Sequence, residues 1–310
     1  MNLPAVALAL GAAVLCCPAL LADQGASPAP VPDAADVHYG AHERQVFDLW
    51  LPKPTGPDAP LIVFIHGGGF VSGDKSLVLG MHGMLERLLA QGFAVASINY
   101  RYCGPGVPLP EPMRDAARAV QFLRANAPRW GIDRRRVALC GGSAGAGIAL
   151  WLAFHDDLAE RRSADPVARQ STRVSCAFVW DAQTSYDLRF FRKYIGGHLD
   201  ENELGPILYQ LPREQFETPA AHALFREISP IEFVSAGDPP VMLYYEVSCT
   251  PLPSDAPPSE GAHHPAFGPP LQARVQEVGG VCLLRHKDDY AAQGGSWAAD
   301  IHAFLERYLR

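Results

Sequence analysis

A serine lies at the centre of the run Gly141-Gly142-Ser143-Ala144-Gly145, between an apolar strand-like segment and an alanine-rich helical one. A serine hydroxyl can attack an acyl carbon only when it is exposed and close to a base. A sharp strand-to-helix turn exposes the hydroxyl and tolerates only small neighbours. The helix N-terminus behind it adds positive potential and a free backbone N–H. The run therefore predicts that Ser143 is a nucleophile.

A second motif, His66-Gly67-Gly68-Gly69-Phe70, directly follows the apolar run Leu61–Ile65. Successive glycines let the backbone turn so that its N–H groups point into a site. Such donors stabilise the oxyanion of a tetrahedral intermediate, and each contributes about 3–4 kcal/mol to kcat. A plain glycine turn is the alternative, but the elbow serine further along the chain favours an oxyanion loop.

The elements that must carry these motifs alternate between strand-like and helix-like segments. This order predicts an α/β fold, with a mostly parallel central sheet and helices on both of its faces. The alternating run Gln45–Leu51 predicts a half-exposed edge strand, and the mainly apolar runs predict buried strands. These are Leu61–His66, Phe93–Asn99, Arg136–Cys140, Val174–Trp180, Pro240–Tyr245 and Val281–Arg285. Helices are expected at Leu77–Gln91, Glu111–Ala127, Ala144–Phe154, Pro270–Val278 and Ala298–Leu309.

The alternation stops between residues 182 and 238, where aromatic and charged helical fragments follow one another. An insert after the fifth strand, Val174–Trp180, would overhang a site built on strand ends, so we expect a cap there; a surface excursion is the alternative. Residues 23–36, rich in Ala, Pro, Asp and Ser, predict a flexible lead-in. One α/β domain is expected to span residues 37–310.

The two motifs, together with Asn99-Tyr100-Arg101 and Asp115-Ala116-Ala117-Arg118, resemble the BD-FAE-like and hormone-sensitive-lipase-like esterase branch of the α/β hydrolases. The resemblance covers residues 38–180 and returns near 229–243. It implies carboxylic-ester hydrolysis through a serine–acid–histidine triad, without a cofactor.

On the family pattern Ser143 is the nucleophile of that triad. The oxyanion donors would be the backbone N–H groups of Gly68, Gly69 and Ala144. The resemblance implies that His66 supports the oxyanion loop and takes no part in the chemistry.

The acid is harder to place, because the C-terminal half departs from the family pattern. Cys249 stands where the family has its aspartate. Alignment backwards from the helix Pro270–Val278 puts Glu260 at the acid position, and a glutamate can orient a histidine as well as an aspartate can. Asp255 and Glu246 remain alternatives.

The base also departs from the pattern, since the expected loop, Lys287–Ala292, contains no histidine. His286, at the end of the last strand, is the nearest candidate. His264, in Ala262-His263-His264-Pro265, is the alternative base, and His302 on the terminal helix is expected to be structural. A site without any triad base also stays open.

These residues favour a serine hydrolase that acts on small acyl esters or on esterified sugars. The competing hypothesis is a catalytically weak or inactive hydrolase-fold protein that binds a small ligand beneath its cap. The oxyanion loop and the elbow favour the enzyme, and the irregular histidine loop favours the binding protein.

The composition of the chain limits which classes of binding partner and which metal sites we expect. The net charge is −7 and no run rich in Lys or Arg is present, which argues against nucleic acid as a partner. The spacing of the cysteines and histidines predicts no structural metal. Of seven cysteines, Cys16 and Cys17 would leave with a signal peptide. We expect the other five to be mainly buried free thiols, with at most one or two bridges.

The apolar stretch Pro4–Ala22 predicts a signal peptide spanning residues 1–22, cleaved before Asp23. A membrane anchor is the alternative, because the stretch is nearly long enough to span a bilayer. Cleavage predicts a secreted or periplasmic protein with no stable membrane association.

Overall fold

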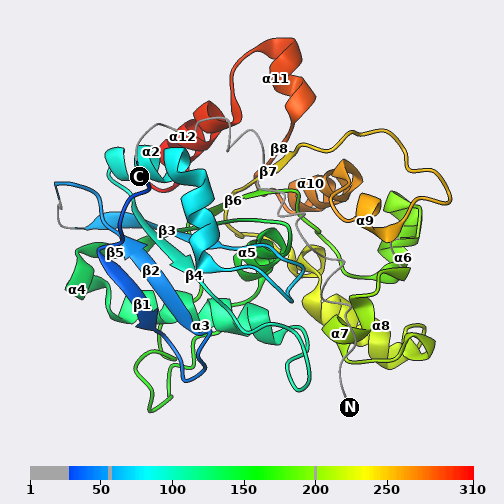
Figure 1. The fold of residues 1–310 in the computed structure, drawn as a ribbon, viewed down its shortest axis with the longest axis horizontal. Helices are drawn as coiled ribbons and strands as arrows, with labels where there is room; N and C mark the ends of the chain where they lie inside the picture. The colour runs from blue at the N-terminus through cyan, green and yellow to red at the C-terminus, as the bar shows by residue number, and fades with distance from the viewer. Residues whose placement is uncertain (1–27, 55–57, 199–200) are drawn as a thin grey trace.

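The central sheet explains how distant segments meet at one edge of the molecule. The protein is described here by a computed structural model that places residues 28–54, 58–198 and 201–310. Eight strands follow the order β1-β2-β4-β3-β5-β6-β7-β8 (Figure 1). β1 and β2 are antiparallel to their neighbours, and the other pairs are parallel. The strands are Ala34–His38, Val46–Trp50, Ala59–Ile65, Ala94–Ile98, Ile132–Gly142, Cys176–Trp180, Val241–Tyr245 and Cys282–His286.

The side chains of each buried strand pack into two separate cores, because successive side chains point to opposite faces of the sheet. On β3, Leu61, Val63 and Ile65 belong to one core, and Ile62 and Phe64 belong to the other. This explains why β3, β6 and β7 are apolar along their whole length. The predicted α/β fold with a mostly parallel sheet is confirmed.

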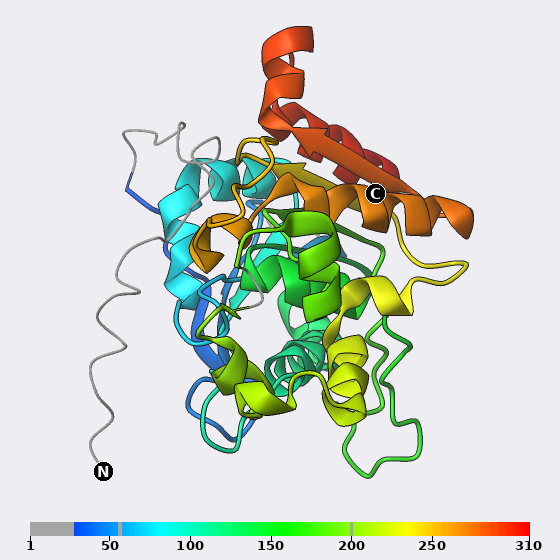
Figure 2. The ribbon, with the colours of Figure 1, turned by 90° about the vertical axis from the view of Figure 1, so that its right-hand side faces the viewer.

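Helices cover both faces, as expected for a largely parallel sheet. α3, α5 and α10 pack on one core, and α2 and α12 pack on the other (Figure 2). The bounds of the α-helices are α2 His82–Ala90, α3 Glu111–Ala125, α4 Ala127–Trp130, α5 Ala144–Phe154, α6 Leu188–Phe190, α7 Gly205–Tyr209, α8 Pro219–Ile228, α9 Pro258–Gly261, α10 Gly268–Glu277, α11 Lys287–Gln293 and α12 Trp297–Tyr308.

The edge of the sheet differs from the prediction. β2 was expected at the edge, yet all five of its residues are buried. The edge strand is β1, whose residues Ala34–His38 overlap the predicted flexible lead-in. β1 pairs with β2, and the N–H of Asp33 donates to the carbonyl of Leu49 at 2.8 Å. Backbone pairing orders this polar segment although its composition is that of a linker.

The segment between β6 and β7 carries short helices and turns, among them α6, α7 and α8. In Figure 1 it lies beside α9 and α10, at the side of the molecule away from β1 and β2. α8 spans Pro219–Ile228. Whether this segment acts as a cap stays a prediction.

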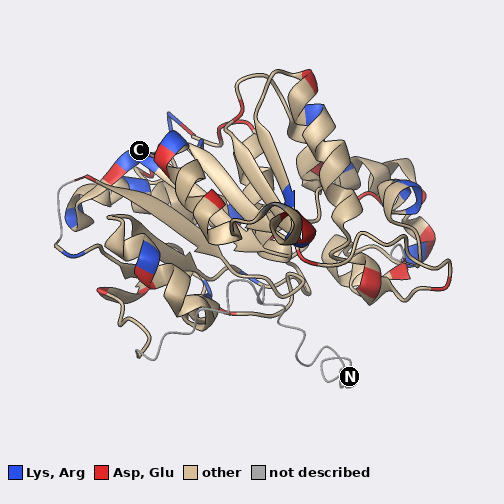
Figure 3. Ribbon diagram, turned by 90° about the horizontal axis from the view of Figure 1, so that it is seen from above, with Lys and Arg blue, Asp and Glu red and all other residues tan. Residues whose placement is uncertain are grey.

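The remaining predictions on surface and targeting concern features outside the site. Charged residues of both signs are interspersed along the helices (Figure 3). The five cysteines of the described part are free, and all but Cys249 are buried. No helix among residues 28–54, 58–198 and 201–310 is long and apolar enough to cross a bilayer. The predicted signal peptide, residues 1–22, lies outside the described residues.

Candidate active site

Ser143 occupies a strained turn between β5 and α5. Its backbone has φ 54° and ψ −123°, a conformation that residues with a side chain rarely adopt. The N–H of Ser143 donates to the carbonyl of Trp180 at the end of the neighbouring strand, at 3.1 Å. Ala144 opens α5, so its N–H belongs to the first turn, which has no partner within the helix. The elbow inferred from the sequence is thus present in the backbone.

The elbow needs glycine because the oxyanion-loop strand passes very close to it. A Cβ on Gly145 would lie 2.0 Å from the carbonyl oxygen of Ile65, the last residue of β3. On the other side, a Cβ on Gly67 would lie 3.4 Å from the Cβ of Ser143. The glycine-rich loop and the serine therefore form one continuous surface at the carboxyl ends of β3 and β5.

The loop after β3 turns back on itself at Gly68. The carbonyl of Gly68 accepts the N–H groups of Val71 and Ser72, at 3.1 and 3.0 Å. Gly68 and Gly69 have φ of 110° and 60°, values that favour glycine. Within the described residues, neither of their own N–H groups donates a hydrogen bond. Unpaired N–H groups next to Ser143 are the arrangement an oxyanion hole requires.

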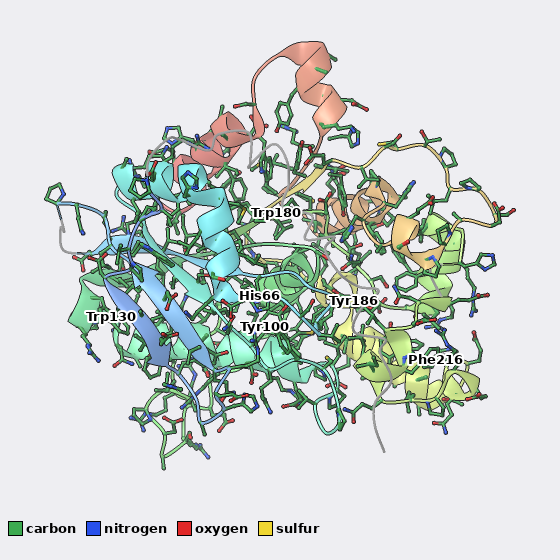
Figure 4. The ribbon with its side chains drawn as sticks, in the orientation of Figure 1. His66, Tyr100, Trp130, Trp180, Tyr186 and Phe216 are labelled. Atoms are coloured by element: carbon green, nitrogen blue, oxygen red, sulfur yellow. The ribbon has the colours of Figure 1, made fainter. Side chains whose placement is uncertain are left out.

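His66 supports this loop from beneath. Its Nδ1 donates to the carbonyl of Gly67 at 2.7 Å, and its Nε2 accepts from the Arg44 guanidinium at 3.3 Å. The ring stacks on Tyr100, with ring centres 4.2 Å apart (Figure 4). Burial, helped by the Arg44 charge, lowers the pKa of His66 to about 4. His66 is therefore neutral at neutral pH, and its ring contacts the backbone of this loop at Gly67.

The histidine at the serine is His263. Its Nε2 lies 2.8 Å from Ser143 Oγ, a normal hydrogen-bond distance. It lies between α9 and α10, in the loop that follows β7. Burial lowers the pKa of His263 to about 4, so the ring is neutral and can accept the serine proton.

His286, the predicted base, does not contact Ser143. Its Nε2 donates to the carbonyl of Val247 at 2.7 Å, and its Nδ1 accepts the N–H of Asp288 at 3.2 Å. The predicted loop after β8 is the helix α11, with His286 as its N-cap. The Asp289 carboxylate completes this capping box by accepting the His286 N–H at 2.7 Å. Both ring nitrogens are thus already engaged, which corrects the assignment.

The other two histidines also lie elsewhere. His264, the alternative base, is buried; its Nδ1 accepts the N–H of Ala266 and its Nε2 donates to the carbonyl of Thr250, both at 3.1 Å. It caps the short 3₁₀ helix Pro265–Phe267. His302 lies on α12, half-exposed and 4.0 Å from Glu306. Neither contacts the serine.

The structure brings no predicted carboxylate to the histidine. Glu260 and Asp255 are exposed, and neither forms an ion pair with a histidine of the described residues. Glu246 follows β7, and its N–H donates to Asp181 Oδ1 at 3.2 Å. Among the described residues, no carboxylate forms a hydrogen bond with His263. The acid position of the predicted triad is therefore not filled by Glu260.

Asp181 is a buried carboxyl that lies outside the motifs seen in the sequence. It directly follows β6, beside the strand that carries Ser143, and has φ 50°. Burial raises its pKa to about 6, against the opposing effect of the Glu246 N–H. The carboxylate of Glu246 adds to the rise, and the nearby His286 opposes it. Asp181 thus lies near His286, the histidine that does not contact Ser143.

Two signals could have found the missed residues. Asp181 stands directly after a buried strand, at the sheet edge where sites form in α/β folds. His263 stands beside His264, the residue predicted as the alternative base. Their order in the chain could not show which ring would face Ser143, because neighbouring loop residues point in different directions. Among the described residues no cluster of side chains could bind a metal ion.

The fold and the turn that carries Ser143 define the class: this is an α/β-hydrolase fold with a strand-to-helix elbow on its central sheet. The BD-FAE family model matches residues 47–247, most of the chain, and the chain belongs to that family.

Curated relatives match over part of the chain. The esterase LipC of Mycobacterium tuberculosis is 36% identical over 115 residues, covering 36% of this chain and 28% of that protein. The isoprenylcysteine alpha-carbonyl methylesterase of Arabidopsis thaliana is 34% identical over 113 residues, covering 36% and 25%. The match thus spans little more than a quarter of the length of these relatives.

Solved structures match over nearly the whole chain. A truncated carbohydrate esterase from gut microbiota has a TM-score of 0.68 at 18% identity, covering 92% of this chain and 98% of that one. Esterase 2 of Thermogutta terrifontis, solved with butyrate bound, has a TM-score of 0.60 at 18% identity, covering 90% and 94%. At this identity the likeness establishes the shared fold.

Proposed function

We propose that this protein is a carboxylic-ester hydrolase in which Ser143 is the nucleophile and His263 is the general base. The observation that carries the proposal is the 2.8 Å hydrogen bond between His263 Nε2 and Ser143 Oγ. It pairs a serine on a strained elbow with a neutral imidazole, which is the combination that activates a hydroxyl.

In the first half-reaction, Ser143 Oγ attacks the ester carbonyl carbon while its proton passes to His263 Nε2. The carbonyl oxygen becomes an oxyanion and accepts hydrogen bonds from the N–H groups of Gly68, Gly69 and Ala144. When the intermediate collapses, the bond to the alcohol oxygen breaks and His263 returns the proton to that oxygen. An acyl-serine and a free alcohol result.

In the second half-reaction, His263 takes a proton from a water molecule, whose oxygen attacks the acyl carbon. The same N–H groups stabilise the second oxyanion. The bond to Ser143 Oγ then breaks, and the proton on His263 returns to the serine. The acid leaves and the site is restored, so no cofactor is consumed.

The substrates we propose are esters of short acyl groups, including acetylated or otherwise esterified sugars. Leu204 supports this, since its Cδ1 lies 2.9 Å from the point that a Cβ on Gly69 would occupy. A side chain so close to the oxyanion loop limits the room for a long acyl chain. The names of structural neighbours, a carbohydrate esterase and an esterase with butyrate bound, agree with this range.

The decisive experiment is labelling with a fluorophosphonate, followed by mapping of the modified peptide. We expect one adduct, on Ser143, that is absent from Ser143→Ala. Wild-type protein should hydrolyse p-nitrophenyl acetate and butyrate, and both Ser143→Ala and His263→Ala should lose that activity. A folded wild-type protein without an adduct at Ser143 contradicts the proposal.

The alternative is a catalytically weak protein that binds a ligand beneath residues 182–238. The observation in its favour is that His263 makes no hydrogen bond with a carboxylate of the described residues. Such a protein would bind a short-chain ester or acid without turnover, which calorimetry and the labelling experiment distinguish from catalysis.

We also propose that residues 1–22 direct export, to the periplasm or the medium. The apolar stretch Pro4–Ala22 and the small residue before Asp23 support this. N-terminal sequencing of protein expressed from the full chain tests it, with Asp23 as the expected first residue.

A further inference from the structure

The segment that carries His263 is a short irregular stretch between α9 and α10. It turns through internal hydrogen bonds: the N–H of His264 donates to Gly261 at 3.1 Å and the N–H of Phe267 donates to His264 at 3.2 Å. The His264 ring extends this turn by bonding both to Ala266 and to Thr250. The segment is thus a defined turn, although it belongs to neither helix.

Two adjacent residues, Gln183 and Thr184, form hydrogen bonds with the backbone of this turn on both sides of His263. The Gln183 side-chain amide donates to the carbonyl of Ala262, the residue directly before His263. Thr184 Oγ1 donates to the carbonyl of Phe267 at 2.8 Å, in a fully buried contact. The base-bearing turn is therefore fixed through its backbone at two points that bracket the histidine.

These two residues are tied closely to the nucleophile. They follow β6 after Asp181 and Ala182, and the last residue of β6, Trp180, accepts the N–H of Ser143 at 3.1 Å. Ala182 is itself fixed, because its carbonyl accepts the Tyr245 hydroxyl at 2.8 Å. A short and well-anchored stretch of chain therefore links the serine to the turn that presents the base.

Aromatic side chains pack against Phe267, at the C-terminal end of the same turn. The Phe267 ring stacks on Phe190 of α6, with ring centres 5.6 Å apart and planes 11° apart. Phe191 meets the same ring edge-on, at 5.9 Å. In Figure 1, α6 lies beside α9, so the insert after β6 supports the turn.

In most serine hydrolases a carboxylate orients the imidazole, and here no carboxylate of the described residues bonds to His263. We propose that Gln183 and Thr184 are positioning residues that take over the orienting task, by fixing the backbone on both sides of His263 so that Nε2 faces Ser143. This inference rests on the proposed function, in which His263 is the base. It identifies the insert after β6 as a part of the catalytic geometry.

The test uses side chains of matched size that cannot donate. Thr184→Val and Gln183→Met should lower kcat for p-nitrophenyl acetate about 10- to 100-fold, because a displacement of the base by about 1 Å has effects of that size. KM should stay within about twofold. The rate of fluorophosphonate labelling should fall in the same proportion as kcat, and Thr184→Ser should restore both.

Thr172→Val is the matched control. Thr172 is as buried as Thr184, and its Oγ1 accepts the N–H of Leu158 at 3.0 Å, before the start of β6 and away from the site. This variant should lower the melting temperature as Thr184→Val does, with kcat unchanged. If Thr184→Val fails to fold, Gln183→Met, at a partly exposed position, decides the question.

The inference is overturned if Gln183→Met and Thr184→Val keep wild-type kcat, or if Thr172→Val loses as much kcat as they do. Failure of the proposed function looks different, because His263→Ala would then keep its activity in the same assay. Loss of activity in His263→Ala together with full activity in both positioning variants rejects the positioning role alone.

Discussion

The two halves of the candidate site are built in different ways. The oxyanion loop and the serine elbow follow β3 and β5, which are neighbouring parallel strands with Ile65 in register with Gly141. His263 comes from a loop that is 120 residues beyond Ser143 in sequence. One half is positioned by the hydrogen bonds of the sheet, and the other by the packing of loops against an insert.

This contrast shows where prediction from sequence is robust. Strand register and backbone torsions restrict a turn that directly follows a strand to few conformations. A loop between α9 and α10 has no such restriction, and its adjacent residues His263 and His264 bond to quite different partners. The following predictions test this contrast from both sides.

The largest effect is expected from the two histidines that compete for the role of base. His263→Ala should lower kcat/KM about 10²- to 10⁴-fold, the usual contribution of a general base. His286→Ala should leave kcat/KM within about threefold of wild type, yet cost about 0.5–2 kcal/mol of stability, because it removes the N-cap of α11. Steady-state kinetics and urea unfolding measure the two effects. The opposite pattern would indicate that His286, at the end of β8, is the base.

The next effect concerns the oxyanion loop. Gly68→Ala should lower kcat about 10²- to 10³-fold, since a Cβ there would lie 2.2 Å from the carbonyl oxygen of Ser72 and force the donors out of place. Gly92→Ala is the control: Gly92 also has a positive φ, of 85°, but a Cβ on it meets nothing within 4 Å. Unfolding measurements should show strain in both variants, and kinetics should show lost activity only in the first.

The pH dependence should follow His263. Because burial lowers the pKa of His263 to about 4, kcat/KM should stay level on acidification until about pH 4 and then fall about tenfold per pH unit. A base with the ordinary pKa of 6.5 would already lose activity below neutrality. A pH–rate profile with an acid limb near 6.5 would favour a more exposed histidine as the base.

Stability should respond to acid earlier than catalysis does. His263 and His66 both have pKa values of about 4 when folded and about 6.5 when unfolded, so the unfolded chain binds more protons between these values. Their contribution is fully present above about pH 6.5 and declines as the pH falls toward 4. Denaturant unfolding at a series of pH values measures this, and a stability that is flat across the window would contradict the burial of the two rings.

A smaller effect is expected from Arg44, which braces the oxyanion loop through His66. Its Nε donates to the carbonyl of Tyr100 at 2.9 Å, and its guanidinium lies 3.6 Å from the centre of the Tyr102 ring. Arg44→Met should lower kcat about fivefold to tenfold, or about 1 kcal/mol. Arg129→Met removes an exposed arginine that packs on Trp130, far from the loop, and should leave kcat unchanged.

The smallest effect is expected at the acid position predicted from the sequence. Glu260 is exposed on α9, so Glu260→Gln should keep kcat/KM within about twofold and stability within about 0.5 kcal/mol. A loss of more than tenfold in kcat/KM would show that Glu260 contacts the base during turnover. The acid position would then have been predictable from the sequence, as the serine elbow was.

Much of the fold was accessible from the sequence because its signals are local. The apolar runs in β3, β4 and the second half of β5 are typical of strands buried on both faces, and the elements around them alternate as a parallel sheet requires. The edge was misplaced for the opposite reason: β1 has a linker-like composition and is ordered by its pairing with β2. The composition of a segment does not show whether another strand is available to pair with it.

The sequence by itself determined the nucleophile elbow and the glycine loop, because a few contiguous residues dictate each backbone path. Only the tertiary structure decided which histidine meets Ser143. The Asp288 and Asp289 groups engage His286 as a helix cap, and Gln183 and Thr184 fix the turn that presents His263. These contacts join residues far apart in the chain, so their geometry depends on how the loops pack and not on any local pattern.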